Sequence, residues 1–183
     1  MTVQERAITV EQFEAFAQQP ENTDKLFEFI AGEIVEVPTN MLASKIAALF
    51  VTFIGMYLLE NDIGHVTGAD GGYQIFGDRY APDAAYISYE RQPEPTTSGY
   101  NPNPPELVVE VVSSDSKAEN EKLTVKLGNY LASGTLVWIV RPEAAAVEVY
   151  APGQPVQTLG KADTLTGGDV LPDFAVELTK IFK

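Results

Sequence analysis

The sequence predicts an α/β fold in which helices flank a mixed β-sheet. Strand-like and helix-like segments alternate through the middle of the chain, and paired short strands are expected near both ends. The segment 135–140, TLVWIV, is apolar throughout, which is typical of a strand buried on both faces. Alternating strands and helices favour layers packed around a central sheet. We therefore expect one α/β domain covering residues 1–183.

The amino-terminal part of the chain predicts a short helix followed by a hairpin. Thr9 and Gln12 have the spacing of a capping box, which predicts that an amphipathic helix begins there. Residues 26–30 and 33–37 have the character of two strands, and Ala31-Gly32 between them fits a tight two-residue turn. Glu28 and Glu33 then fall on one face of the hairpin. One of them is expected to complete a metal shell through water, and the alternative is an exposed residue of a half-buried strand.

A long apolar helix is expected after Thr39 or Asn40, ending near Glu60. Its stretch 46–59 carries no charge in 14 residues, whereas a membrane span needs about 20, so a membrane location is disfavoured. A helix that is apolar on all sides has to be covered on all sides. We therefore expect a homodimer with this helix in its interface, because self-complementary pairs are the commonest oligomers.

The rest of the chain alternates between short strands, loops and helices. The five prolines between residues 89 and 105 predict an irregular loop. Gly134 is expected to stop the helix that precedes the buried strand. The remaining expected elements are strands at 65–67, 73–76, 80–88 and 106–112, a helix at 117–133, an outer hairpin of 146–150 with 156–160, and a closing helix at 174–182.

Composition excludes several kinds of site. The chain has no cysteine, so it forms neither disulfides nor thiolate metal sites, and its single histidine, His65, is expected to be structural. The amino terminus lacks the pattern of a secretory signal, which makes a cytoplasmic location the default expectation. The net charge is −14, from 12 basic and 26 acidic residues. Any contact with nucleic acid is therefore expected to be local or assisted by a metal.

Two carboxylates and two lysines form the candidate site. In the strand 106–112, Glu110 lies between two valines on a half-buried face, where a carboxylate is costly unless it is paired or coordinated. Asp83 follows Pro82, and taken alone it would be a turn residue. On the following helix, Lys126 lies nearer than Lys122 to the apolar stripe, so its amine is better placed to point inward. The alternatives are a buried salt bridge for Glu110 and solvated lysines.

These residue types suit metal-dependent phosphodiester hydrolysis. Carboxylate oxygens hold hard divalent cations such as Mg²⁺ or Mn²⁺, which polarise a phosphoryl oxygen and acidify a bound water. A neighbouring lysine offsets the charge that develops in the transition state.

The order of these motifs resembles the PD-(D/E)XK nuclease superfamily, in particular its branch of bacterial restriction-endonuclease-like proteins. The resemblance runs through TVEQFEAF, KLFEFIAGEIVEVP, RYAPDAAYIS and PELVVEVVSS to the lysine-bearing helix, and covers nearly the whole chain. It implies a restriction-endonuclease-like fold and a DNA endonuclease activity. It also implies a metal held by Asp83, Glu110 and the carbonyl of Val111, and Lys126 or Lys122 as the catalytic lysine.

The sequence departs from the superfamily pattern at two places. Val112 stands where the motif has lysine, and Ala43-Ser44-Lys45 stands where a histidine is common. A catalytically inactive binding or regulatory domain with the same fold therefore remains an alternative. A metal-free acid/base hydrolase using Asp83 and Glu110, as in glycosidases, is a second alternative. Such an enzyme is expected to have a sugar-binding cleft lined by aromatic residues, whereas the aromatic residues of this chain fall mostly on core positions.

Overall fold

The structure, a computed structural model, describes residues 8–22, 24–37, 40–97, 99–114 and 116–183. Its helices are α1 (Val10–Ala17), α2 (Met41–Glu60) and α3 (Lys117–Ala132), with a 3-10 turn η1 (Leu178–Lys180) near the end. The strands are β1 (Phe27–Ile30), β2 (Glu33–Glu36), β3 (Gly64–Gly68), β4 (Tyr73–Ile75), β5 (Asp78–Tyr80), β6 (Ala84–Ser88), β7 (Leu107–Val111), β8 (Leu136–Arg141), β9 (Ala146–Tyr150), β10 (Gln157–Gly160), β11 (Thr164–Gly167) and β12 (Leu171–Glu177).

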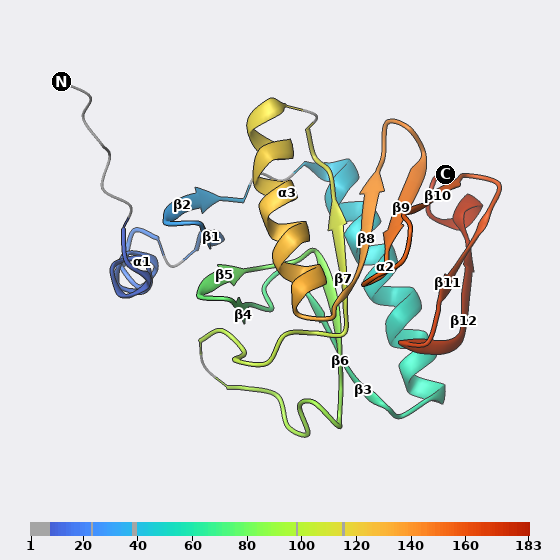
Figure 1. Ribbon diagram of the computed structural model, residues 1–183, viewed down its shortest axis with the longest axis horizontal. Helices are drawn as coiled ribbons and strands as arrows, with labels where there is room; N and C mark the ends of the chain where they lie inside the picture. Colours follow the sequence, from blue (N-terminus) through green and yellow to red (C-terminus); the bar gives the residue numbers. More distant parts are fainter. Residues whose placement is uncertain (1–7, 23, 38–39, 98, 115) are drawn as a thin grey trace.

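A six-stranded mixed sheet forms the centre of the molecule, in the order β10-β9-β8-β7-β6-β3. Strands β7 and β8 are parallel and are connected through α3, and the other neighbours are antiparallel. Helices α2 and α3 cover opposite faces of this sheet (Figure 1). The predicted mixed sheet flanked by helices is confirmed.

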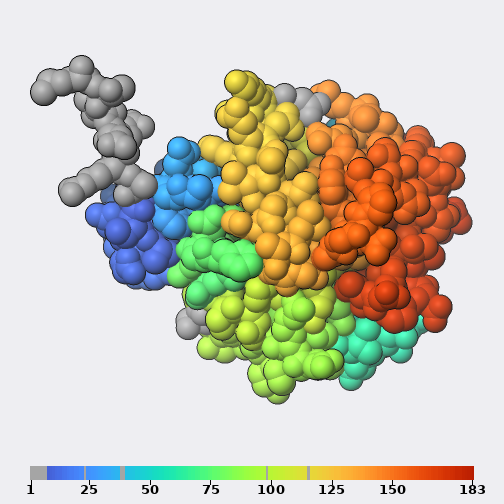
Figure 2. Space-filling view, viewed as in Figure 1, coloured from blue at the N-terminus to red at the C-terminus, as the bar shows by residue number. Residues whose placement is uncertain are grey.

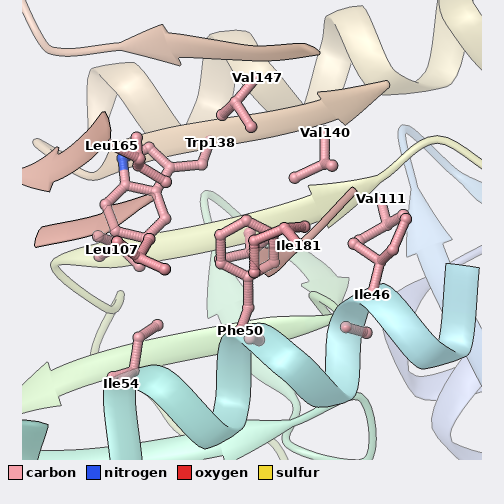
Figure 3. Close-up of a cluster of buried hydrophobic side chains, with 14 of the residues drawn as sticks. Ile46, Phe50, Ile54, Leu107, Val111, Trp138, Val140, Val147, Leu165 and Ile181 are labelled. Carbon is pink, nitrogen blue, oxygen red and sulfur yellow. The ribbon is translucent and has the colours of Figure 1, made fainter. Parts of the chain in front are cut away.

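The alternation of side chains along β7 decides which residues face which helix. Leu107, Val109 and Val111 face α2, while Val108 belongs to the core beneath α3. On the α2 side, Ile46 and Phe50 point toward the sheet, as Figure 3 shows. Because successive side chains of a strand alternate, Glu110 points with Val108 toward α3.

A second, four-stranded sheet has the order β2-β1-β5-β4 and carries α1. Phe13 of α1 packs on Phe29 of β1 with ring centroids 5.5 Å apart. The predicted hairpin is confirmed: Ala31 and Gly32 form its turn with φ of 49° and 89°. Positive φ at both positions is typical of the type I′ turns that suit the twist of a hairpin.

Two predicted elements were wrong. The expected strand 80–88 is two strands, because β5 belongs to the small sheet and β6 to the large one, and residues 81–83 cross between them. The expected helix 174–182 is instead the end of β12, which pairs with β11, followed by the short turn η1. In β12 the buried residues are Leu171, Phe174 and Val176, and the residues between them are exposed. The first interval is three residues instead of two, and Asp173 within it has a positive φ of 63° that breaks the regular strand. That irregular spacing resembles a helical pattern in the sequence.

Helix α2 is covered both by the central sheet and by the C-terminal hairpin of β11 and β12. The C-terminal hairpin packs against it, with Tyr57 donating a hydrogen bond of 2.7 Å to the carbonyl of Pro172 and its ring 5.6 Å from that of Phe174. Met56 and Leu59 still point outward, 59% and 87% exposed. Within the described residues α2 is the one helix with the length and hydropathy of a membrane span. That is weak evidence, because core helices meet the same criteria.

Candidate active site

A buried ionic cluster lies where β7, β1 and α3 meet. The Nζ of Lys126 is 2.8 Å from Oε1 of Glu28 and 2.8 Å from Oε1 of Glu110. The hydroxyl of Tyr130, one helical turn after Lys126, donates a hydrogen bond of 2.9 Å to the same oxygen of Glu110. All four residues are buried. The cluster therefore joins the large sheet, the small sheet and α3 through charged side chains.

Asp83 stands at the edge of this cluster, in the segment that crosses between the two sheets. Its Oδ2 accepts a hydrogen bond of 2.7 Å from the N–H of Val111, at the end of β7. Two residues earlier, the N–H of Ala81 donates a hydrogen bond of 2.8 Å to Glu28. The crossing segment thus fixes Asp83 on one side and Glu28 on the other. Asp83 and Glu110 line one pocket.

The cluster holds more negative than positive charge. Burial raises the pKa of Asp83, although the hydrogen bond from Val111 and the charge of Lys126 oppose that rise. Burial also raises the pKa of Glu110, to about 7, with further contributions from the nearby charges of Glu28 and Asp83. Three carboxylates share one ammonium, so the site gains from additional positive charge.

Lys126 and Tyr130 both keep their protons at neutral pH. Burial pulls the pKa of Lys126 down, but the charges of Glu110 and Glu28 outweigh burial and leave it above its ordinary value. Burial raises the pKa of Tyr130 well above its ordinary value, and the charge of Glu110 raises it further. Lys126 is therefore a cation and Tyr130 a neutral hydrogen-bond donor.

Glu28, Glu110 and Lys126 of the cluster line a pocket of about 470 Å³. The β1–β2 hairpin, α3 and the end of β7 with the residues after it contribute most of the other lining residues. Seven acidic and three basic side chains line this pocket. In Figure 2, α3 runs across the visible face between the N-terminal segments in blue and the C-terminal strands in orange and red. In addition to the cluster residues and Asp83, the charged lining residues are Asp24, Lys25, Glu36, Asp70, Glu119 and Lys122.

The structure brings together most, but not all, of the residues singled out in the sequence. Asp83, Glu110, Val111, Glu28 and Lys126 all line the pocket. Lys122 also lines it, but forms no ion pair with any residue in the described part of the chain.

The structure changes the set of candidate residues at two positions: Glu33 leaves it and Tyr130 joins it. Glu33 shares a hairpin face with Ile30, its partner in register, but its side chain is exposed and is not among the pocket residues. Tyr130 was not among the candidate site residues of the sequence. A buried tyrosine hydroxyl needs a polar partner, and Glu110 lay within reach across the sheet face. That requirement was the signal that could have revealed its role.

The donor set fits a divalent cation of the Mg²⁺ type. Among the described residues, no group of three or more His, Cys, Asp or Glu side chains is arranged as a ready metal cage. Mg²⁺, however, is commonly bound by one or two carboxylates and several waters rather than by a complete protein cage. Asp83 and Glu110 supply such oxygens, and the surplus of buried negative charge favours a cation there.

The fold and the polar cluster define an α/β protein of the restriction-endonuclease-like class. The chain belongs to the Uma2 family, described as "Putative restriction endonuclease", whose family model matches residues 10–179. The restriction-endonuclease-like family generally uses divalent metals. The resemblance inferred from the sequence motifs is thereby confirmed.

A solved structure shares the whole fold. It is the crystal structure of a "putative nuclease belonging to DUF820" from Anabaena variabilis ATCC 29413. The two chains are 21% identical and align with a TM-score of 0.79 over 96% of this chain and 97% of that one. None of the curated proteins matches the sequence. At this identity the likeness establishes the fold.

Proposed function

We propose that the protein is a Mg²⁺- or Mn²⁺-dependent endodeoxyribonuclease, with its active site in the pocket between the β1–β2 hairpin and α3. The observation that carries the proposal is the buried cluster of Glu110, Glu28 and Lys126 beside Asp83. Buried carboxylates in excess over their counter-ions are rare in structures that have no use for them. Membership of the Uma2 family supports the same reaction class.

Each residue has an assigned part in this proposal. Asp83, Glu110 and the backbone carbonyl of Val111 would hold the metal, and Glu28 would reach it through water. A bound divalent cation supplies a Lewis acid and an acidified water. Lys126 stays protonated and offsets the negative charge that accumulates on the phosphoryl group. Lys122, at the pocket wall, is the second candidate for that part or for a contact with a neighbouring phosphate.

The acidic charge restricts how DNA can bind. Three lysines among the pocket residues face seven carboxylates, so the chain offers few contacts to a phosphate backbone. We therefore infer a short, local contact with the nucleic acid near the metal. A cytoplasmic location fits such a substrate.

A homodimer completes the proposal. Met56 and Leu59, near the end of α2, are large apolar side chains exposed on a strongly acidic protein. Two copies that pack through these residues would bury them. A dimer would also present two sites to the two strands of a duplex.

A second candidate is a catalytically inactive domain of the same fold, and one observation favours it. Lys126 already binds both Glu28 and Glu110, so the cluster is satisfied in part as an internal ion-pair network. In that case the residues would stabilise the junction of the two sheets instead of catalysing a reaction.

Plasmid nicking distinguishes the two candidates. Supercoiled DNA is incubated with the protein in Mg²⁺, in Mn²⁺ and in EDTA, and the relaxed product is quantified. The nuclease proposal predicts metal-dependent nicking by the wild type and loss of nicking by Asp83→Ala. Lys161→Ala, at an exposed position that does not line the pocket, is the control and should nick as the wild type does. Absence of nicking by the wild type in either metal would favour the inactive domain.

A further inference from the structure

Tyr130 contacts the candidate ligand Glu110 from within the protein core. Its side chain is completely buried, and its hydroxyl donates a hydrogen bond of 2.9 Å to Oε1 of Glu110. Lys126 approaches both oxygens of the same carboxylate, at 2.8 and 2.9 Å. Glu110 thus has one charged and one neutral donor, each from α3.

The two donors constrain the carboxylate differently. The ammonium of Lys126 is a compact charge with three rotatable donors on a flexible stem, so it attracts the carboxylate with little directional preference. Tyr130 has two side-chain torsions and a rigid ring, which fixes where its hydroxyl lies. Tyr130 therefore adds a directional constraint on Glu110 that the ammonium of Lys126 does not supply by its charge.

The ring of Tyr130 packs edge to face on Tyr80, with centroids 5.3 Å apart, and the hydroxyl of Tyr80 begins a polar relay. The hydroxyl of Tyr80 donates a hydrogen bond of 2.7 Å to Oδ2 of Asp78 and accepts one of 2.6 Å from the side-chain amide of Asn129. Oδ1 of Asp78 accepts a hydrogen bond of 3.1 Å from the N–H of Ala31, at the hairpin turn. The relay therefore ends on the hairpin that carries Glu28.

We propose that Tyr130 is a positioning residue, which orients the Glu110 carboxylate and so determines how tightly the site holds a divalent cation. The inference rests on the proposed function, because it assigns Glu110 as a ligand. Groups that orient metal-binding side chains typically contribute 10- to 100-fold to metal affinity.

The test is Mn²⁺ binding measured by calorimetry on the full chain at pH 8. Tyr130→Phe removes the hydroxyl and keeps the ring, so its packing on Tyr80 is retained. We expect its Mn²⁺ affinity to fall by about 10- to 100-fold. Tyr57→Phe is the matched control, because it removes a hydroxyl that hydrogen-bonds the carbonyl of Pro172 far from the site. Its affinity should equal that of the wild type.

A second pair of variants separates positioning from general packing. Glu110→Asp keeps the charge but withdraws the carboxylate from Tyr130. Adding Tyr130→Phe to Glu110→Asp should then weaken Mn²⁺ binding no further. An equal loss in both backgrounds would show that Tyr130 acts only through packing. Tyr80→Phe removes the next hydroxyl of the relay and is expected to weaken binding less than Tyr130→Phe does.

The outcomes also distinguish failure of this inference from failure of the proposed metal-dependent nuclease function. If Glu110→Gln loses Mn²⁺ binding while Tyr130→Phe binds as the wild type does, positioning by Tyr130 is wrong and the metal site stands. If the wild type itself binds no Mn²⁺, the proposed function and this inference both fail. Should Tyr130→Phe not fold, the comparison of Tyr80→Phe with Tyr57→Phe decides the matter, and equal affinities would overturn the proposal.

Discussion

Replacing Lys126 by methionine is the sharpest single perturbation of the site. Methionine has a similar length and can occupy the same buried space, but it removes the charge that pairs with Glu28 and Glu110. The side chains of all three residues are largely excluded from solvent, at 7%, 5% and 11% exposed. Within the described residues, Glu28 and Glu110 then lose the one cation that pairs with them.

The expected cost follows from that burial. Removing one partner of a buried ion pair typically costs about 3–5 kcal/mol, because the remaining charge is left uncompensated. The cost should be smaller at pH 6 than at pH 8, because Glu110, whose pKa is raised to about 7, can take up a proton at the lower pH. Lys122→Met is the matched control on the same helix and should change stability by no more than about 0.5 kcal/mol.

Urea unfolding in EDTA, followed by circular dichroism, measures the difference. We expect Lys126→Met at pH 8 to unfold at a clearly lower urea concentration than both the wild type and Lys122→Met. The reasoning is refuted if the two lysine variants have the same midpoint. It is also refuted if Lys126→Met loses as much stability at pH 6 as at pH 8.

Three further predictions concern pH, salt and assembly. The folded-state pKa of Glu110, about 7, lies above its ordinary 4.5, so its contribution to stability is complete below pH 4.5 and is lost as pH rises through 7. That loss amounts to ~3 kcal/mol; urea titrations of the metal-free protein should show it, and Glu110→Gln should abolish it. Because three lysines line the pocket, the slope of log affinity for an oligonucleotide against log salt should be no steeper than about −3, and a steeper slope would reveal further basic contacts. Leu59→Lys, which adds a charge to the exposed surface of α2, should convert the dimer to a monomer in light scattering; a wild type that is already monomeric would contradict the proposed interface.

The choice between the two lysines shows how much the sequence could predict. The apolar stripe of the helix 117–133 placed Lys126 near the core, and the structure buries it in contact with Glu28 and Glu110. Helical geometry was sufficient, because the positions of side chains around a helix follow from its periodicity. The burial of Glu110 could be predicted for a similar reason, because the alternation of side chains along a strand determines which face of the sheet each residue lies on.

Other features depended on contacts between distant segments, which the sequence does not reveal. The crossing at residues 81–83 places Glu28 near Asp83, but only the pairing of β1 with β5 shows it. The hydrogen bond from Tyr130 to Glu110 forms only because α3 docks on the sheet, and the sequence does not show that docking. The error at β12 arose because its apolar spacing fits two periods, and pairing with β11 decided between them.

Calorimetric titration of Mn²⁺ into the metal-free protein tests the metal site most directly. The proposed ligands predict saturable binding by the wild type at pH 8, retained by Lys122→Met and lost by both Asp83→Ala and Glu110→Gln. The affinity should also rise between pH 6 and pH 8, as Glu110 gives up its proton. Binding that is unchanged in Glu110→Gln, or absent from the wild type, would contradict a metal site formed by Asp83 and Glu110.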